Sequence, residues 1–381
     1  MPTGAAALDL LPRLAKALAG DHPVMPHAAS GPVPPVPDHD PATLPDALAV
    51  VVGTSGTTGT PKRAMLTAPA LRASARATHG ALGGPGQWLL AVPAHHIAGL
   101  QVLVRSLDAG TPPLALDLAG GFRPQAFVAA VAAFAPGARR YTSLVPTQVV
   151  RLLDHPGGGD ALRTFDAVLV GGAAMPPRLR ARATRARVNL VATYGMSETA
   201  GGCVYDGTAL PRTEVEIDEE GRILLGGPTI AHGYLGLADL TREAFGTDED
   251  GIRWFRTDDV GHTDDHGRLH VDGRLDDLVN TGGLKVAPRL VEEAILEHVP
   301  GVRDVLVVGS PDHEWGEVVC ALLVLEPGAL HAVTSADLRA HLRDVVPDHA
   351  LPRRARTVAE LPTRGPGKPD RRAVAALFTM G

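Results

Sequence analysis

The sequence lacks several features that point to particular classes of protein. Only two of its 381 residues are cysteine, Cys203 and Cys320, and no Cys/His cluster surrounds either, which argues against a disulfide framework and a zinc site. No apolar run reaches the 18 residues of a transmembrane candidate, and we find no secretory leader, so we expect a cytoplasmic protein without membrane insertion. The net charge is −6 and basic residues form no cluster, so we do not expect a nucleic-acid partner.

Lysine is also scarce. Of the 36 basic residues, only four are lysines, and these are Lys16, Lys62, Lys285 and Lys368. An ammonium group is a compact charge whereas a guanidinium group is a planar fork, so the two are not interchangeable. In a chain that uses arginine almost everywhere, each lysine is a candidate for a specific role.

Short apolar runs alternate with helical patterns through the first two hundred residues. Buried strands are predicted at 47–52, 88–92, 141–144, 167–170 and 190–193, and helices at 68–81, 124–134 and 146–153. This alternation predicts an α/β fold with parallel strands. From about Glu214, short strands with glycine turns indicate a β-rich subdomain. The last hundred or so residues, with helices at 288–297 and 335–345 and strands at 302–309 and 318–324, indicate a small α+β lobe followed by a Pro/Gly-rich tail.

The segment from Gly53 to Lys62 (GTSGTTGTPK) follows the first predicted strand and precedes helix 68–81, for which Thr67 is a candidate N-cap. Its glycines let the backbone turn tightly, its hydroxyls donate hydrogen bonds, and Lys62 supplies a charge, all of which suit phosphate. Pro61 and Arg63 stand where a Walker A loop needs Gly and Ser or Thr, so this is a different phosphate loop. The candidate phosphate contacts are Thr54, Ser55, Gly56, Thr57, Thr58, Gly59 and Lys62.

This loop resembles the signature of the adenylate-forming superfamily, which includes acyl-CoA synthetases, adenylation domains of peptide synthetases, and luciferases. Four further segments are similar to that family in the same order, at 193–199 (TYGMSET), 254–259 (WFRTDD), 273–286 (GRLDDLVNTGGLKV) and 361–371 (LPTRGPGKPDR). The resemblance implies a large ATP- and acid-binding domain at 1–274, with a shortened N-terminus. It also implies a mobile lid domain at 275–381.

The resemblance assigns roles in the large domain residue by residue. Tyr194 would stack on adenine, Ser197 would contact phosphate, and Glu198 would bind Mg²⁺, for which a carboxylate oxygen is a suitable ligand. Asp259 would bind the ribose hydroxyls, although Asp258 stands where the family usually has glycine, which leaves the local turn open. The nucleotide and acyl pocket would be completed by Gly172, Ala173, Thr193 and Gly195.

The remaining roles fall around the lid domain. Arg274 would lie near the ribose, Asp276 would be the hinge, and Lys285 would lie on the strand that forms the tunnel for the thiol of coenzyme A. Lys368 would be the catalytic lysine that stabilises charge as the acid attacks the α-phosphate. The implied reaction uses ATP, Mg²⁺ and coenzyme A, with acyl-AMP formed first and the thioester second.

The segment 93–100 (PAHHIAGL) resembles the pocket helix of the family, with His96 facing the acyl group. Together with segment 197–207 and the short chain, it is most similar to the 2-succinylbenzoate–CoA ligases of menaquinone biosynthesis. That acid has a second carboxylate, and the candidates to bind it are His96, Thr142, Ser143 and Arg105. Three alternatives stay open, namely a CoA ligase for another aryl or acyl acid, an adenylation domain that loads a carrier protein, and a regulatory protein that binds nucleotide without catalysis. A homodimer also stays open.

Overall fold

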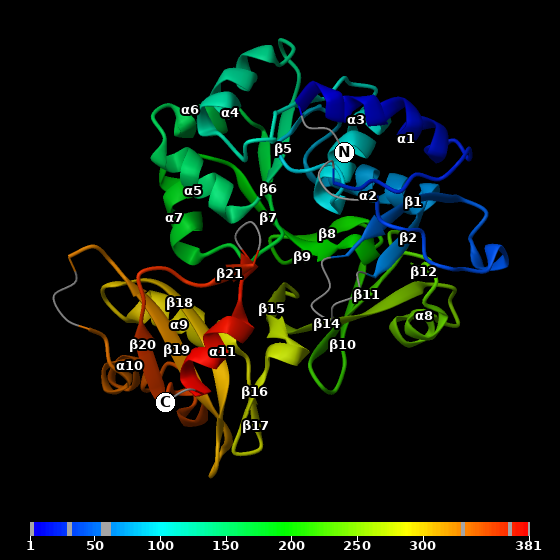
Figure 1. The fold of residues 1–381 in the computed structure, drawn as a ribbon. Helices are drawn as coiled ribbons and strands as arrows, with labels where there is room; N and C mark the ends of the chain where they lie inside the picture. Colours follow the sequence, from blue (N-terminus) through cyan, green and yellow to red (C-terminus); the bar gives the residue numbers. More distant parts are fainter. Residues whose placement is uncertain (1–3, 29–32, 55–61, 329–331, 365–367, 380–381) are drawn as a thin grey trace. The chain divides into compact units, whose positions relative to one another are not determined.

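The computed structural model describes residues 4–28, 33–54, 62–328, 332–364 and 368–379 (Figure 1). The chain forms two compact units. Unit 1 consists of Met1–Glu216, Leu224–Thr257 and Thr263–Leu269, and unit 2 consists of Ile217–Ile223, Asp258–His262 and His270–Gly381. Residues 217–223, 258–262 and 270–274, which precede the expected domain boundary at residue 275, therefore group with unit 2.

The largest sheet of unit 1 has seven strands in the order β4-β3-β5-β6-β7-β8-β9. The strands are β3 (Gln87–Leu90), β4 (Leu114–Ala115), β5 (Arg140–Leu144), β6 (Ala167–Val170), β7 (Leu190–Met196), β8 (Gly201–Tyr205) and β9 (Thr208–Ala209). Pairing is parallel from β4 to β7 and antiparallel from β7 to β9. The predicted α/β fold with parallel strands is therefore confirmed.

Helices cover both faces of this sheet, with α4 to α7 on one side and α1 to α3 on the other (Figure 1). They are α1 (Leu11–Leu18), α2 (Ala68–Ala81), α3 (Ile97–Ala109), α4 (Pro124–Ala130), α5 (Pro146–Asp154), α6 (Gly158–Arg163) and α7 (Pro177–Arg185), with 3-10 turns at Gly4–Leu10, Pro41–Thr43 and Val131–Ala133. The strand β6 is apolar and buried along its whole length, as expected of a parallel strand that is covered on both faces.

A second sheet of unit 1 flanks the phosphate loop. It consists of β1 (Leu48–Gly53), β2 (Arg63–Thr67) and β12 (Gly233–Tyr234), all antiparallel, in the order β1-β2-β12. The sequence predicted that a strand, the loop and helix 68–81 follow one another directly. That order is wrong in one respect, because the strand β2 lies between the loop and the helix and pairs with β1. The N-cap is confirmed, since the Oγ1 of Thr67 accepts a hydrogen bond from the backbone N–H of Ala70.

Short strands follow, as the glycine-rich pattern after Glu214 predicts. The sheet has the order β10-β11-β14-β13, with β15 paired to β14. Its strands are β10 (Glu214–Ile217), β11 (Arg222–Gly226), β13 (Phe245–Thr247), β14 (Arg253–Thr263) and β15 (Leu269–Arg274), and helix α8 (Ala238–Ala244) precedes β13. The strand β14 is thus flanked by both β11 and β15.

The main sheet of unit 2 has the order β17-β16-β19-β18, with β20 parallel to β19. Its elements are η5 (Leu275–Asp277), β16 (Val279–Thr281), β17 (Leu284–Val286), α9 (Pro288–His298), β18 (Val302–Asp312), β19 (Gly316–Leu325), α10 (Ser335–Leu342), a 3-10 turn at Asp348–Ala350 and β20 (Arg354–Thr357). Alternate residues of β18 and β19 enter two different cores, with Val305 and Val307 in one and Leu306 and Val308 in the other. Both faces are therefore covered, as expected of a small α+β lobe.

The end of the chain departs from the sequence prediction. The Pro/Gly-rich tail contains the short hairpin β21 (Thr363–Arg364) and β22 (Lys368–Pro369) and then a helix, α11 (Arg371–Thr379). Val374 and Phe378 of α11 are buried against β18 and β19, so an apolar contact with the sheet stabilises a helix that the local composition did not indicate. Across the described part of the chain, every helix is too short or too polar to cross a bilayer.

Candidate functional site

The phosphate loop connects two paired strands. Gly53 pairs with Arg63, and the backbone N–H of Thr54 donates a 2.8 Å hydrogen bond to the carbonyl of Lys62, so the two ends of the loop lie side by side. The predicted contacts at Ser55, Gly56, Thr57, Thr58 and Gly59 lie outside the described residues. The pairing of β1 and β2 therefore determines where the loop begins and ends.

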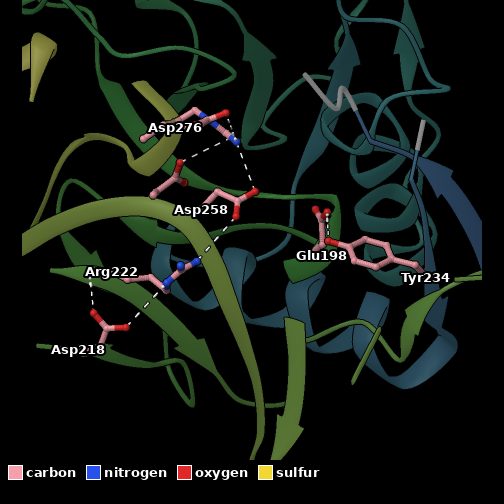
Figure 2. Close-up of polar contacts among 8 residues, drawn as sticks. Glu198, Asp218, Arg222, Tyr234, Asp258 and Asp276 are labelled. Atoms are coloured by element: carbon pink, nitrogen blue, oxygen red, sulfur yellow. Dashed lines mark hydrogen bonds and ion pairs between the residues drawn. The ribbon is translucent and has the colours of Figure 1, made fainter. Parts of the chain in front are cut away.

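Glu198, the predicted Mg²⁺ ligand, is buried and hydrogen-bonded. The hydroxyl of Tyr234 donates a 2.9 Å hydrogen bond to its Oε1, as Figure 2 shows, and the N–H of Ala231 donates to its backbone carbonyl. The Nζ of Lys62 lies 5.3 Å from the centroid of the Tyr234 ring, within the range of a cation–π contact. Tyr234 therefore contacts two predicted site residues. The sequence prediction missed it, because only the pairing of β12 with β2 brings it there.

The reversal between β7 and β8 places Glu198. Gly195 has a φ of +152°, and a Cβ at this position would lie 2.2 Å from the carbonyl oxygen of Gly201, so no side chain fits. Ala200 adopts a left-handed conformation with a φ of 51°, which is unfavourable for a residue with a Cβ. The buried Gln101 of α3 donates a 2.7 Å hydrogen bond to the carbonyl of Ala200. This contact, which the sequence did not indicate, holds α3 against the turn that carries Glu198.

Other residues predicted to bind the nucleotide lie at or just after the ends of β6 and β7. Tyr194 and Gly195 belong to the end of β7, and Ser197 begins the 3-10 turn Ser197–Thr199. The Oγ1 of Thr193 donates a 3.3 Å hydrogen bond to the carbonyl of Val170, the last residue of β6. Gly172 and Ala173 lie just after β6, separated from it by Gly171, and are exposed. Unit 1 thus places these residues at neighbouring strand ends, where α/β proteins commonly bind ligands.

In unit 2, the predicted ribose and hinge residues meet at one arginine. The guanidinium of Arg274 faces three carboxylates, with Nε 2.8 Å from Asp276, Nη2 3.4 Å from Asp258 and Nη1 4.0 Å from Asp259. Burial alone would lower the pKa of Arg274, but the hydrogen bond to Asp276 and the charges of the aspartates raise it overall. The three carboxylates therefore stabilise the positive charge of Arg274.

Two lysines with predicted roles lie on short strands of unit 2. Lys285 pairs with Asn280 across the β16–β17 hairpin and is exposed. Lys368 begins β22 and pairs with Arg364 of β21. Both predicted roles stay predictions.

The acyl-pocket candidates divide into two groups. His96 is exposed and occupies the N-cap position of α3, whereas Ser143 is buried on β5. Arg105 and Thr142 are buried as well, and both side chains contact internal partners. The guanidinium of Arg105 lies 4.9 Å from the centroid of the Trp88 ring and 3.5 Å from the hydroxyl of Tyr205, and Thr142 donates to the carbonyl of Leu89. Arg105 and Thr142 therefore pack as core residues, which could not be read from the sequence, and their role at a second carboxylate stays a prediction.

His95, which precedes His96, is half-buried, and the centroids of the two rings are 4.3 Å apart. Burial, and then the neighbouring charge of His96, lower the pKa of His95 to about 4. His95 is therefore neutral near pH 7.

No group of three or more His, Cys, Asp or Glu side chains within the described ranges could hold a metal ion by itself. A magnesium ion needs few protein ligands when substrate phosphates and water complete its octahedral shell. The buried carboxylate of Glu198, oriented by Tyr234, fits that requirement.

Comparisons with known proteins agree with this geometry. The profile of the AMP-binding enzyme family matches residues 9–235, and that of the AMP-binding enzyme C-terminal domain matches residues 290–368. A probable 2-succinylbenzoate–CoA ligase from Mycobacterium tuberculosis is 43% identical over 99% of this chain and 97% of its own. A sulfoacetate–CoA ligase from Cupriavidus necator is 32% identical over 91% of this chain and 69% of its own.

Solved structures are similar as well. The o-succinylbenzoate CoA synthetase from Bacillus subtilis, in complex with its acyl-adenylate intermediate, has a TM-score of 0.72 and 26% identity over 86% of this chain and 69% of its own. The amide bond synthetase from Marinactinospora thermotolerans has a TM-score of 0.76 and 31% identity over 88% of this chain and 69% of its own. The fold is thus shared by enzymes that differ in their acceptors.

We expect Tyr234→Phe to increase the Mg²⁺ concentration that gives half-maximal ATP–pyrophosphate exchange by about threefold to tenfold. The variant keeps the ring beside Lys62 but removes the donor to Glu198, and the loss of one buried hydrogen bond typically costs about 1 kcal/mol. The matched control is Tyr205→Phe, which removes another buried tyrosine hydroxyl that contacts Thr78. Equal Mg²⁺ requirements in the two variants would show that Tyr234 does not orient Glu198.

We expect the free energy of unfolding to fall as the pH drops from about 6.5 towards 4, in part because of His95. Its pKa is about 4 in the folded chain and 6.5 by reference, so the unfolded state binds more protons within this window. Urea unfolding at several pH values should show a weaker decline for His95→Gln. His22→Gln is the control, since the side chain of His22 is fully exposed. An unchanged slope in His95→Gln would contradict this assignment.

Proposed function

The chain belongs to the AMP-binding enzyme family, and we propose that it activates 2-succinylbenzoate with ATP as an acyl-adenylate and then transfers the acyl group to coenzyme A. This is the ligase step of menaquinone biosynthesis. The observation that carries the choice of acid is the similarity to the probable 2-succinylbenzoate–CoA ligase, which extends over almost the whole of both chains. The similarity in fold to the synthetase that holds its succinylbenzoyl-adenylate supports the same choice.

The ATP half of the reaction uses the residues to which the family resemblance assigns roles. The loop from Thr54 to Lys62 binds the phosphates, Tyr194 stacks on the adenine, and Asp259 and Arg274 bind the ribose. Glu198 binds Mg²⁺, which neutralises phosphate charge when bound. The hydrogen bond from Tyr234 fixes the carboxylate of Glu198 in the orientation that the cation needs.

The first step needs little activation of the nucleophile. The carboxylate of the acid is already anionic, so it attacks the α-phosphorus of ATP without losing a proton, and pyrophosphate leaves. Lys368 neutralises the charge that accumulates on the α-phosphate and on the attacking carboxylate, which is the main contribution that a protein can make to phosphoryl chemistry.

The second step exchanges AMP for the thiol of coenzyme A. Asp276, in the 3-10 turn Leu275–Asp277, is the hinge at which the lid domain 275–381 changes position. Lys285, which is exposed on β17, then lies on the strand beside the incoming thiol. The thiol sulfur attacks the acyl carbon, the bond between that carbon and the phosphate oxygen breaks, and AMP leaves while the thiol proton passes to solvent.

The second carboxylate of the acid is bound by His96 and Ser143. His96 is exposed at the start of α3, where unpaired backbone N–H groups also favour an anion. Ser143 is buried on β5 and pairs with Leu169 of β6, the strand that precedes the predicted pocket residues Gly172 and Ala173. We exclude Arg105 and Thr142 from this role because their polar groups contact internal partners, namely Trp88 and Tyr205 for Arg105 and the carbonyl of Leu89 for Thr142.

A panel of acids in ATP–pyrophosphate exchange tests the proposed substrate. We expect 2-succinylbenzoate to support exchange most strongly, and product mass after addition of coenzyme A to show its thioester. The panel should include sulfoacetate, benzoate and medium-chain fatty acids, and the second step should be repeated with a simple amine and with a phosphopantetheinyl carrier protein. A thioester from another acid but none from 2-succinylbenzoate would refute the proposed substrate, and exchange with no acid would refute the ligase.

Lys368→Ala should slow adenylation by about a hundredfold or more, because it removes a cation that acts on the developing charge of the transition state. Rapid-quench measurement of acyl-AMP formation tests this. The same variant, supplied with preformed acyl-AMP and coenzyme A, should form thioester at a rate within about threefold of the wild type, because the lid domain that carries Lys368 has changed position before that step.

Lys16→Ala is the control for this experiment, since Lys16 lies in α1 outside the five motif segments to which roles are assigned. Equal losses in the two half-reactions of Lys368→Ala would contradict the role of Lys368 in adenylation.

A further inference from the structure

Asp258 occupies the position at which the family usually has glycine, and its side chain lies between two arginines. Arg222 of β11 is 3.8 Å from one of its oxygens, and Arg274, the last residue of β15, is 3.4 Å from the other. Figure 2 shows Arg222 reaching both Asp218 and Asp258. Because β14 is flanked by β11 and β15, these contacts form a row of alternating charges across three neighbouring strands.

Asp258 and Asp276 both contact Arg274, but they restrain its guanidinium relative to different parts of the structure. Asp276 lies two residues after Arg274, so that pair restrains the guanidinium only relative to its own turn. Asp276 is also the proposed hinge residue, and a partner on the hinge moves when the hinge moves. Asp258 belongs to β14, so it restrains the same guanidinium relative to the sheet.

Arg222 makes this arrangement electrostatically favourable. Asp258 and Asp259 are adjacent in the chain, and two neighbouring carboxylates repel each other unless cations lie close by. The side chain of Arg222 is 20% exposed and that of Asp258 is 54% exposed, so the pair is partly shielded from solvent on the arginine side. A single pair of this kind adds little to folding stability, but cross-strand pairs of opposite charge can fix a side chain in one orientation.

We propose that Asp258 is a positioning residue that orients the guanidinium of Arg274 for recognition of the ribose of ATP, with Arg222 holding Asp258 in place. The inference rests on the proposed function, because it takes from that function the role of Arg274 at the ribose. Asp258 thus takes part in nucleotide binding at a position where glycine could make no such contact.

The experiment compares ATP with 2′-deoxyATP and 3′-deoxyATP. Equilibrium binding of each nucleotide to the wild type and to Asp258→Asn reports recognition of the ribose without any requirement for an acid. We expect Asp258→Asn to weaken ATP binding by about threefold to tenfold and to weaken binding of the deoxynucleotides less, so that the preference for ATP falls. Asp258→Gly should behave in the same way, and Asp258→Glu should recover part of the preference.

Arg222→Gln should reproduce the effect of Asp258→Asn, and the double variant should be no worse than either single variant, because both changes release the same guanidinium. In ATP–pyrophosphate exchange, the KM for ATP should rise while kcat and the KM for 2-succinylbenzoate change less than about twofold. The matched control is Asp239→Asn, which removes an exposed aspartate that pairs with Arg242 outside this row.

The proposal is overturned if Asp258→Asn binds ATP as tightly as the wild type, or if it weakens ATP and both deoxynucleotides equally. Equal weakening would indicate a general effect of charge. If the wild type binds and discriminates the nucleotides but gives no exchange with any acid, the proposed function fails while the binding comparison still decides the role of Asp258.

Discussion

The buried carboxylate of Glu198 is the constraint on which the arrangement of the nucleotide residues in unit 1 depends. A carboxylate that leaves water needs hydrogen-bond donors or cations, because an uncompensated buried charge costs several kcal/mol or more. Tyr234 supplies one donor, and it can do so only because β12 pairs with β2. The strand β2 in turn follows the phosphate loop and begins beside Lys62. One hydrogen bond therefore links the proposed metal ligand to β12, which pairs with the strand that closes the phosphate loop.

The turn before β8 shows how the same region maintains an unfavourable backbone. Gly195 leaves no room for a side chain, and Ala200 adopts a left-handed conformation that alanine rarely takes. The hydrogen bond from Gln101 to the carbonyl of Ala200 offsets part of that cost and comes from the helix that begins after His96. Backbone strain beside functional residues is common, since the surrounding structure can hold a turn that would relax on its own. The segments proposed for the acid and for Mg²⁺ are thus joined through the buried part of α3.

The preference for arginine over lysine also has structural consequences. Arginine forms the cross-strand contacts of Arg222 and Arg274 with aspartates, where a planar group with several donors can face more than one carboxylate at once. Arg105 shows the same adaptability in the core, where its guanidinium lies over the ring of Trp88. The four lysines, by contrast, include Lys62 and Lys368, whose proposed roles at phosphate groups suit a compact charge.

The sequence by itself determined the features that depend on neighbours along the chain. Strand and helix periodicity act over a few residues, so the alternation that forms the parallel sheet and the N-cap at Thr67 could be predicted, and five ordered motifs identified the family. Only the tertiary structure decided the features that depend on distant segments. It added β2 and α11, placed Tyr234 beside Glu198, buried Arg105 in the core, and set Asp258 between two arginines. The strand β2 pairs with the preceding strand across the phosphate loop, whereas the other features depend on contacts between elements far apart in sequence, about which local propensity carries no information.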